Sequence, residues 1–213
     1  MYGLRFDSHK YGFAIHTSSP DLGLALSNFT NDSRTATWDL GRDLSTSLHQ
    51  YIAEFIQPQT WTDLAFIAVA KGPGGFTGTR IGVVTARTLA QQLAIPLFAI
   101  SSLAALAWSD YTQEHADIMY AVELPAQRGQ VFAAIYQPSD AGFVAVLPDV
   151  VLSPDAWQAK LDCWSGAYKL IQSPRNLGET VSSVLELAYF DWQRGKRPDW
   201  SEALPFYGQH PVT

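Results

Sequence analysis

One short stretch of the sequence combines residue types that could bind an anion. It reads GPGGFTG from Gly72 to Gly78, it follows an apolar run at residues 64–69, and a helical pattern continues from it to about Ala94. The sequence thus predicts a strand, then a glycine-rich turn, then the first turn of a helix. This order gathers backbone N–H groups at the positive end of the helix. An anion, or the backbone of a partner, could approach closely there.

The stretch does not match the two common nucleotide-binding motifs. No Gly-x-x-x-x-Gly-Lys-Ser/Thr pattern can be fitted, and Arg80 is not spaced as the phosphate-binding lysine of that motif would be. Gly72 and Gly74 fit a dinucleotide fingerprint, but Thr77 stands where the third glycine is needed. The glycines alone are therefore weak support for phosphate binding.

Other groupings that could carry chemistry are sparse. The five histidines, none of them i, i+4 from another on a helix, offer no metal-binding pair: His9, His16, His49, His115 and His210. A nucleophile, base and acid can be assembled on paper from Ser18, His16 and Asp21, but no strained nucleophile turn accompanies them. The single cysteine, Cys163, excludes an internal disulfide and is expected to be a small buried residue. We therefore expect no catalytic and no metal-binding residues.

The composition limits the class of protein. The chain has 213 residues, 47% of them hydrophobic and 16% charged, which suits a packed globular core. Its net charge of −6 argues against a free-standing nucleic-acid binder but not against a subunit whose partner holds the nucleic acid. We see no secretion signal and no run of about 20 apolar residues that would cross a membrane, so a cytoplasmic location is expected.

The elements that position the glycine-rich stretch follow from apolar periodicity. The first half is expected to contain strands at residues 11–15, 22–28, 35–39, 64–69 and 96–100, with helices at about 43–56, 77–94 and up to 108. A polar connector at residues 109–116 places a boundary between a first lobe, 1–108, and a second lobe, 109–213. The second lobe is expected to contain strands at 118–123, 131–136, 143–152 and 168–172 and helices at 154–161 and 178–194, the last of which could pack back on the first lobe.

The helix after the glycine-rich stretch carries small side chains at every fourth position, which are Gly78, Gly82, Ala86 and Ala90. Two glycines inside a helix cost roughly 1 kcal/mol each relative to alanine, so close approach of another element is expected to offset that cost. The stripe could pack on the chain's own sheet or form a subunit interface, and both can hold because a helix has several faces.

The stretch from Gly72 to Gly82 resembles the signature G-P-G-S-F-T-G-x-R-I-G of the bacterial TsaB family, also called YeaZ, with Gly75 in place of the serine. Residues 95–103 resemble the next strand and helix start of that family, residues 126–132 its second hairpin, and residues 203–207 its C-terminal A-x-P-x-Y. The resemblance spans nearly the whole chain and is strongest from about Ala65 to Leu106.

The resemblance implies an α/β fold with two lobes of the actin and Hsp70 ATPase (RNase H-like) type, in which mixed sheets are flanked by helices. It implies a role in making N6-threonylcarbamoyladenosine at position 37 of tRNA, as a non-catalytic subunit that binds and activates a TsaD-like partner. A TsaE-like ATPase would join them, tRNA would bind only through the complex, and the chain alone could form a homodimer. The expected interface residues lie on the first two helices: Leu48, Ile52, Phe76, Thr77, Gly78, Arg80, Ile81, Gly82, Ala86 and Ala90.

Departures from the family pattern fall at both hairpins that face phosphate in active ATPases of this fold. His16 stands in place of an aspartate after the first strand, and Pro125 and Gln127 replace the aspartate and arginine of the second hairpin. We therefore expect no cofactor and no nucleotide hydrolysis by this chain alone, with a nucleotide at the partner interface left open. The alternatives are a diverged small hydrolase of the glycoprotease type, a kinase of the same fold, and a homodimer without a tRNA role.

Overall fold

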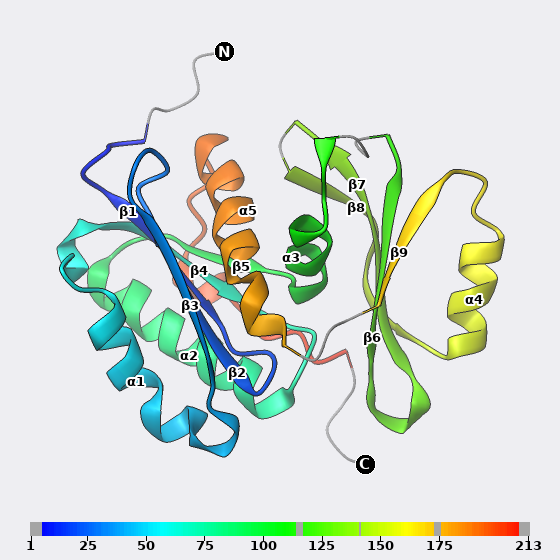
Figure 1. Ribbon diagram of the computed structural model, residues 1–213, viewed down its shortest axis with the longest axis horizontal. Helices are drawn as coiled ribbons and strands as arrows, with labels where there is room; N and C mark the ends of the chain where they lie inside the picture. The colour runs from blue at the N-terminus through cyan, green and yellow to red at the C-terminus, as the bar shows by residue number, and fades with distance from the viewer. Residues whose placement is uncertain (1–5, 114–116, 141, 173–175, 209–213) are drawn as a thin grey trace.

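The structure is a computed structural model that describes residues 6–113, 117–140, 142–172 and 176–208. Two β-sheets stand side by side, with helices outside each sheet and a pair of helices between them (Figure 1). His115, Gln209 and His210 lie outside the described residues.

The first sheet has five strands in the order β3-β2-β1-β4-β5. The strands are β1 (Tyr11–His16), β2 (Asp21–Ser27), β3 (Ser33–Asp39), β4 (Leu64–Ala70) and β5 (Leu97–Ile100). β1, β2 and β3 pair antiparallel, whereas β4 and β5 join β1 in parallel. The nearly unbroken apolar sequences of β1, β2 and β4 are explained by burial on both faces of the sheet.

The second sheet has four strands in the order β8-β7-β6-β9 and repeats this pattern. β6 (Met119–Pro125), β7 (Val131–Ser139) and β8 (Gly142–Leu152) form an antiparallel meander, and β9 (Tyr168–Gln172) joins β6 in parallel. Two lobes that share one strand order have the actin and Hsp70 ATPase (RNase H-like) architecture, so the expected fold class is confirmed.

Helices α1 (Leu44–Phe55) and α2 (Phe76–Leu93) cover the outer face of the first sheet. Their buried apolar residues pack on the outward side chains of the strands, as Leu48 and Val83 do beside Phe13 and Ile15. The opposite face of this sheet is covered by α5 (Val181–Gln193), whose Val184 and Ala188 are fully buried. The first lobe is therefore completed by a helix from the far end of the chain.

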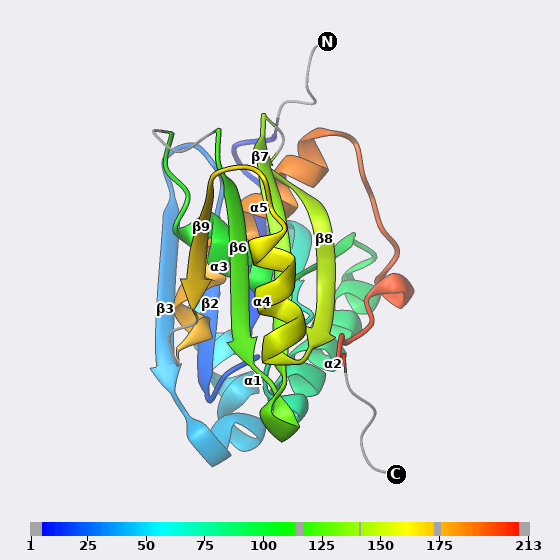
Figure 2. The same ribbon diagram turned by 90° about the vertical axis from the view of Figure 1, so that its right-hand side faces the viewer.

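Helix α3 (Ser102–Ser109) packs on the inner face of the second sheet, and α4 (Pro154–Asp162) covers its outer face (Figure 2). Leu103 and Leu106 of α3 share a core with β6 and β7. The boundary expected after residue 108, which assigns α3 to the first lobe, stays a prediction, because α3 packs both on the second sheet and against α5. A helix between two sheets is apolar on most sides, so its sequence does not reveal on which sheet it packs.

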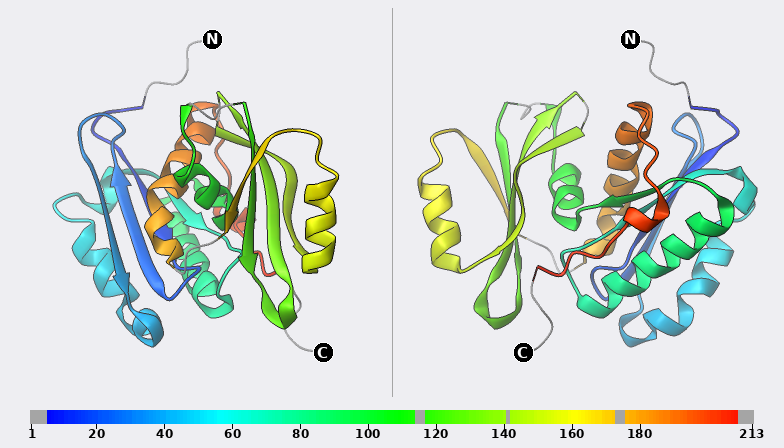
Figure 3. Two further views of the ribbon diagram at one scale, coloured as in Figure 1. Left: turned by 45° about the vertical axis from the view of Figure 1, so that its right-hand side comes forward. Right: turned by 180° about the vertical axis from the view of Figure 1, so that it is seen from behind.

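After α5 the chain runs back along the first lobe, and its last described residues reach the loop that follows β4 (Figure 3). The amide of Leu97 in β5 donates to the carbonyl of Pro198 at 3.3 Å, and the amide of Phe206 donates to the carbonyl of Lys71 at 2.7 Å. Short 3-10 turns complete the described elements: η1 (Gly41–Asp43), η2 (Trp61–Asp63), η4 (Gln127–Gly129), η5 (Leu177–Thr180) and η6 (Trp200–Glu202). Over the ranges described above, no helix has both the length and the apolar character needed to cross a membrane.

Candidate functional site

The glycine-rich loop closes on the chain's own β1–β2 turn. The amide of Gly75, at the N-cap of α2, donates to the carbonyl of Ser18 at 2.7 Å. A Cβ atom on Gly74 would overlap that same carbonyl oxygen, and Gly74 has a φ of +158°. The loop therefore uses its glycines to bring two backbone segments together, and the Gly75 N–H is not available to an anion.

The small-residue stripe of α2 faces the same turn. Thr17 donates its hydroxyl hydrogen to the carbonyl of Gly78 at 2.8 Å, and a Cβ atom on Gly82 would overlap the Thr17 hydroxyl oxygen. Ala86 and Ala90 are fully buried in the core of the first lobe. Gly82, Ala86 and Ala90 therefore pack against the chain's own turn and sheet, which is one of the two expected uses of the stripe, and contact of the stripe with a partner stays a prediction.

His16 is completely buried at the end of β1. Its Nδ1 accepts a hydrogen bond from the backbone amide of Ser18 at 3.3 Å, and desolvation lowers the pKa of His16 from 6.5 to about 3. Asp21 instead accepts a hydrogen bond from the Ser19 hydroxyl at 3.1 Å, and burial raises its pKa. Ser18, His16 and Asp21 therefore do not form a nucleophile–base–acid chain.

A second polar cluster, which is partly buried, joins the end of β5 to the second sheet beside the glycine-rich loop. The Tyr136 hydroxyl and the Ser101 hydroxyl both donate to Oδ1 of Asp149, at 2.7 and 2.9 Å. Burial raises the pKa of Asp149, and burial together with the Asp149 charge raises the pKa of Tyr136 well above 10. Ser101 also caps α3 by accepting from the amides of Leu103 and Ala104, so this cluster fixes the start of that helix.

The second hairpin and Cys163 show no arrangement of side chains that could hold a metal ion. Pro125 ends β6 as an exposed residue, and Arg128 is exposed in η4 with a φ of +58°. Within the described ranges, no three His, Cys, Asp or Glu side chains are close enough to hold a metal ion together. Cys163 is exposed at the C-cap of α4, which corrects the expectation that it is buried.

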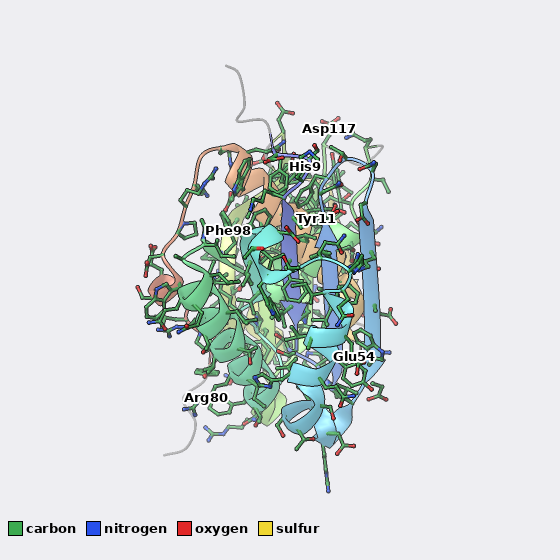
Figure 4. All side chains as sticks on the ribbon, turned by 90° about the vertical axis from the view of Figure 1, so that its left-hand side faces the viewer. His9, Tyr11, Glu54, Arg80, Phe98 and Asp117 are labelled. Carbon is green, nitrogen blue, oxygen red and sulfur yellow. The ribbon has the colours of Figure 1, made fainter. Side chains whose placement is uncertain are left out.

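A hollow of about 540 Å³ lies between α1 and α2 on the outer face of the first lobe. We call it the α1–α2 groove, and the residues that line it are His49, Ile52, Trp61, Arg80, Ile81, Val84, Thr85, Thr88 and Leu89. Val84 is 53% exposed, a large value for a valine, and Figure 4 shows Arg80 reaching outward from α2. A wide apolar groove between two helices can receive the apolar face of a third helix.

The structure separates the ten expected interface residues into two groups. Phe76, Thr77 and Arg80 are exposed, and Gly78 and Ile81 are half-buried. The other five are buried in the chain itself: Leu48, Ile52, Gly82, Ala86 and Ala90. Of the five, only Ile52 reaches the α1–α2 groove.

Sequence reasoning missed most of the groove lining, including Val84 and Thr88 on α2 and Trp61 in η2. Val84 and Thr88 follow Arg80 at steps of four residues, so a helical wheel centred on Arg80 would have found them. Trp61 gave no such signal, because it reaches the groove from a separate turn.

The chain is similar to proteins of tRNA modification. Residues 40–175 match the family model described as TsaD, tRNA N6-adenosine threonylcarbamoyltransferase. The tRNA threonylcarbamoyladenosine biosynthesis protein TsaB of Bacillus subtilis is 46% identical over 87 residues, which are 41% of this chain and 37% of the relative. The protein of the same name from Escherichia coli is 31% identical over 129 residues, which are 58% of this chain.

The matched parts thus amount to 37% and 55% of the lengths of these two relatives. Among solved structures, YeaZ from Pseudomonas aeruginosa superposes with a TM-score of 0.75 at 22% identity, over 93% of this chain and 99% of that one. This likeness shows a shared fold.

Proposed function

Because the chain belongs to the TsaB (YeaZ) family, within the larger family that the TsaD model describes, we propose that it is a non-catalytic subunit for threonylcarbamoyl transfer to adenosine 37 of tRNA. It acts by binding and activating a TsaD-like partner through the outer face of α1 and α2. The observation that carries this proposal is the α1–α2 groove, where Val84 is 53% exposed and the hollow measures about 540 Å³.

The surface near the N-terminus of α2 extends this candidate interface. Phe76, the first residue of α2, is 39% exposed, and its ring centroid lies 4.4 Å from that of Tyr207 in the C-terminal segment. Apolar side chains held in fixed positions at a surface favour binding because little conformational entropy is lost when a partner covers them. Phe76 and the groove together offer a partner a rigid apolar face.

In the proposed complex the chain needs no cofactor of its own, and a TsaE-like ATPase and tRNA join through the partner, in the cytoplasm. The packing of the glycine-rich loop supports this division of labour, because Ser18 and Thr17 fill the space beside Gly74 and Gly78. No specific observation favours the hydrolase or kinase alternatives. Protease and ATPase assays on the isolated chain test these alternatives. Activity above background would support the hypothesis that the chain is itself an enzyme.

Two valines with equal exposure allow a matched test of the interface. Val84 in the groove and Val144 on β8 are each 53% exposed, but they lie on different lobes. Val84→Asp should abolish co-purification with the TsaD-like protein of the same organism, because it places a charge in the apolar contact. Val144→Asp should bind as the unaltered chain does. Equal co-purification of the two variants would refute the proposed interface.

A further inference from the structure

Segments that pass between the two lobes meet at the loop after β4. The amide of Lys71 donates to the carbonyl of Ile100, the last residue of β5, at 2.8 Å. The carbonyl of Gly72 accepts from the amide of Ser102, the first residue of α3, at 2.9 Å. The carbonyl of Lys71 also accepts from the amide of Phe206, in the C-terminal segment, at 2.7 Å. Two neighbouring residues of the first lobe thus hold both segments by their backbones.

Both segments continue into the second lobe. Leu103 of α3 packs in the core formed with β6 and β7, and Phe206 packs against the same core. A Cβ atom on Gly208 would lie 2.6 Å from a methyl carbon of Val151 on β8, so the chain passes close to that strand. A rotation of one lobe against the other would therefore displace both segments from the loop after β4.

Asp149 of β8 adds a side-chain link at the same place. Its Oδ1 accepts a hydrogen bond from the Tyr136 hydroxyl of its own lobe at 2.7 Å and one from the Ser101 hydroxyl, at the end of the first sheet, at 2.9 Å. Burial raises the pKa of Asp149, and these two hydrogen bonds and the positive charge of Lys71 oppose that rise. Groups from both lobes thus stabilise the ionised carboxylate.

The charge of Asp149 makes its hydrogen bonds stronger than the others in this contact, since bonds to an ionised acceptor are roughly twice as strong as neutral ones. Ser101 passes the link on to α3, because its hydroxyl oxygen also accepts from the amides of Leu103 and Ala104 and so caps that helix. We refer to the residues that join the lobes here as the inter-lobe clamp: Lys71, Gly72, Ser101, Ser102, Tyr136, Asp149 and Phe206.

We propose that the Asp149 carboxylate locks the angle between the two lobes by holding the inter-lobe clamp together. Without the carboxylate, the lobes rotate about the segments that join them, while each lobe keeps its own hydrophobic core. Hinge motions of this kind are absorbed by a few residues at the ends of elements, and Ser101 between β5 and α3 has such a position. The inference concerns the chain itself and does not depend on the proposed partner.

The angle between the lobes is measured by the distance between two spin labels on the full chain. One label occupies Cys163, the single cysteine of the sequence, which is exposed on the second lobe at the end of α4. The other is attached through Glu54→Cys, an exposed position on α1, and α1 and α4 lie at opposite ends of the molecule (Figure 1). The labelled chain should give one narrow distance distribution, and Asp149→Ala should broaden or shift it.

Glu123→Ala is the matched control for Asp149→Ala. The Glu123 carboxylate on β6 also accepts two side-chain hydrogen bonds, from Gln172 and from Trp157, but both donors belong to the second lobe. Its loss should therefore leave the distance between the labels unchanged.

Hydrogen exchange gives an independent measurement at the clamp itself. In Asp149→Ala the amides of Lys71, Ser102 and Phe206 should exchange roughly tenfold faster or more, because opening of the clamp breaks the backbone hydrogen bonds that protect them. The amide of Ala126, which is hydrogen-bonded in the β6–β7 turn, should keep its exchange rate.

An Asp149→Ala chain whose label distances and clamp amides behave as in Glu123→Ala would overturn the inference. Equal acceleration of all amides would also overturn it, because it would show a general loss of stability rather than release of the clamp. If thermal melting shows that Asp149→Ala does not fold, Tyr136→Phe provides the test. That variant removes one donor to the carboxylate and should change both measurements in the same direction to a smaller degree, and no change in either would refute the lock.

Discussion

Gly82 shows how a single residue sets the packing of α2. A Cβ atom at this position would overlap the hydroxyl oxygen of Thr17. That hydroxyl donates a hydrogen bond to the carbonyl of Gly78 at 2.8 Å. Gly82→Ala should therefore lower the free energy of unfolding by about 2 kcal/mol, because the cost of overpacking and of a broken hydrogen bond exceeds the gain in helix propensity. Urea unfolding measures the change.

Gly75→Ala is the matched control, since only the Ser18 carbonyl oxygen, at 3.6 Å, lies near its added Cβ. Its stability should change by less than about 0.5 kcal/mol. The double variant Thr17→Ala with Gly82→Ala should lose less free energy of unfolding than the two single variants lose in sum. The reason is that removal of the Thr17 hydroxyl relieves the overlap with the new Cβ atom. A Gly82→Ala chain as stable as the unaltered one would refute the packing described here.

His16 makes stability depend on pH. The unfolded chain binds a proton on this side chain below about pH 6.5, whereas burial keeps the folded side chain neutral down to about pH 3. The contribution of His16 is thus fully present above pH 6.5, and stability should fall progressively as the pH drops below that value, down to about pH 3.

The raised pKa values of Asp21 and Asp149 act in the opposite direction in acid, because the folded state then binds more protons. The difference between the unaltered chain and His16→Asn isolates the histidine. Asn keeps a hydrogen-bond acceptor near the Ser18 amide. Unfolding by urea at several pH values should show this difference shrinking with acidity, and a constant difference would contradict the buried neutral state.

At the scale of elements, α1 is held at its C-terminal end by Arg34 of β3. The guanidinium donates to the carbonyls of Phe55, Ile56 and Gln57, at 3.0, 3.0 and 2.9 Å, and to Oε1 of Gln59 at 2.6 Å. Orphan carbonyls at a helix end favour a cation, so Arg34 both caps α1 and fixes one wall of the groove.

Arg34→Ala should lower the free energy of unfolding by about 2 kcal/mol and speed hydrogen exchange in the last turn of α1. Exposed Arg42 in η1, near the other end of α1, is the control, and its replacement by alanine should change stability by less than about 0.5 kcal/mol. Exchange in α1 that is unaffected by Arg34→Ala would show that the sheet contacts alone order this helix.

The elements themselves were largely predictable from the sequence, and their contacts were not. Apolar runs and punctuation by Pro58, Pro96 and the glycines predicted α1, α2 and β4 close to their observed bounds. The stripe on α2 was visible as a special face, but its partner is Thr17, some 60 residues earlier in the chain. Such long-range contacts leave no periodic signal, so the sequence alone left both packing within the chain and a subunit interface open for the stripe.

At the scale of the whole molecule, the two lobes are joined by segments that cross between them. A Cβ atom on Gly23 of β2 would overlap the carbonyl oxygen of Gly178 in η5, and the Gly178 amide donates to the Ser19 hydroxyl at 3.3 Å. On the other side, the Tyr136–Asp149–Ser101 cluster and the segment through Phe206 span the lobes. The molecule is thus tied at several points, and the α1–α2 groove with its exposed Val84 lies on the outer face of the first lobe.

The most direct test of the proposed role is the threonylcarbamoyladenosine content of tRNA, measured by mass spectrometry of nucleosides in cells that lack the gene. The proposal predicts that deletion removes the modified nucleoside, that the unaltered chain and Val144→Asp restore it, and that Val84→Asp does not. An unchanged level of threonylcarbamoyladenosine in the deleted cells would contradict the central claim.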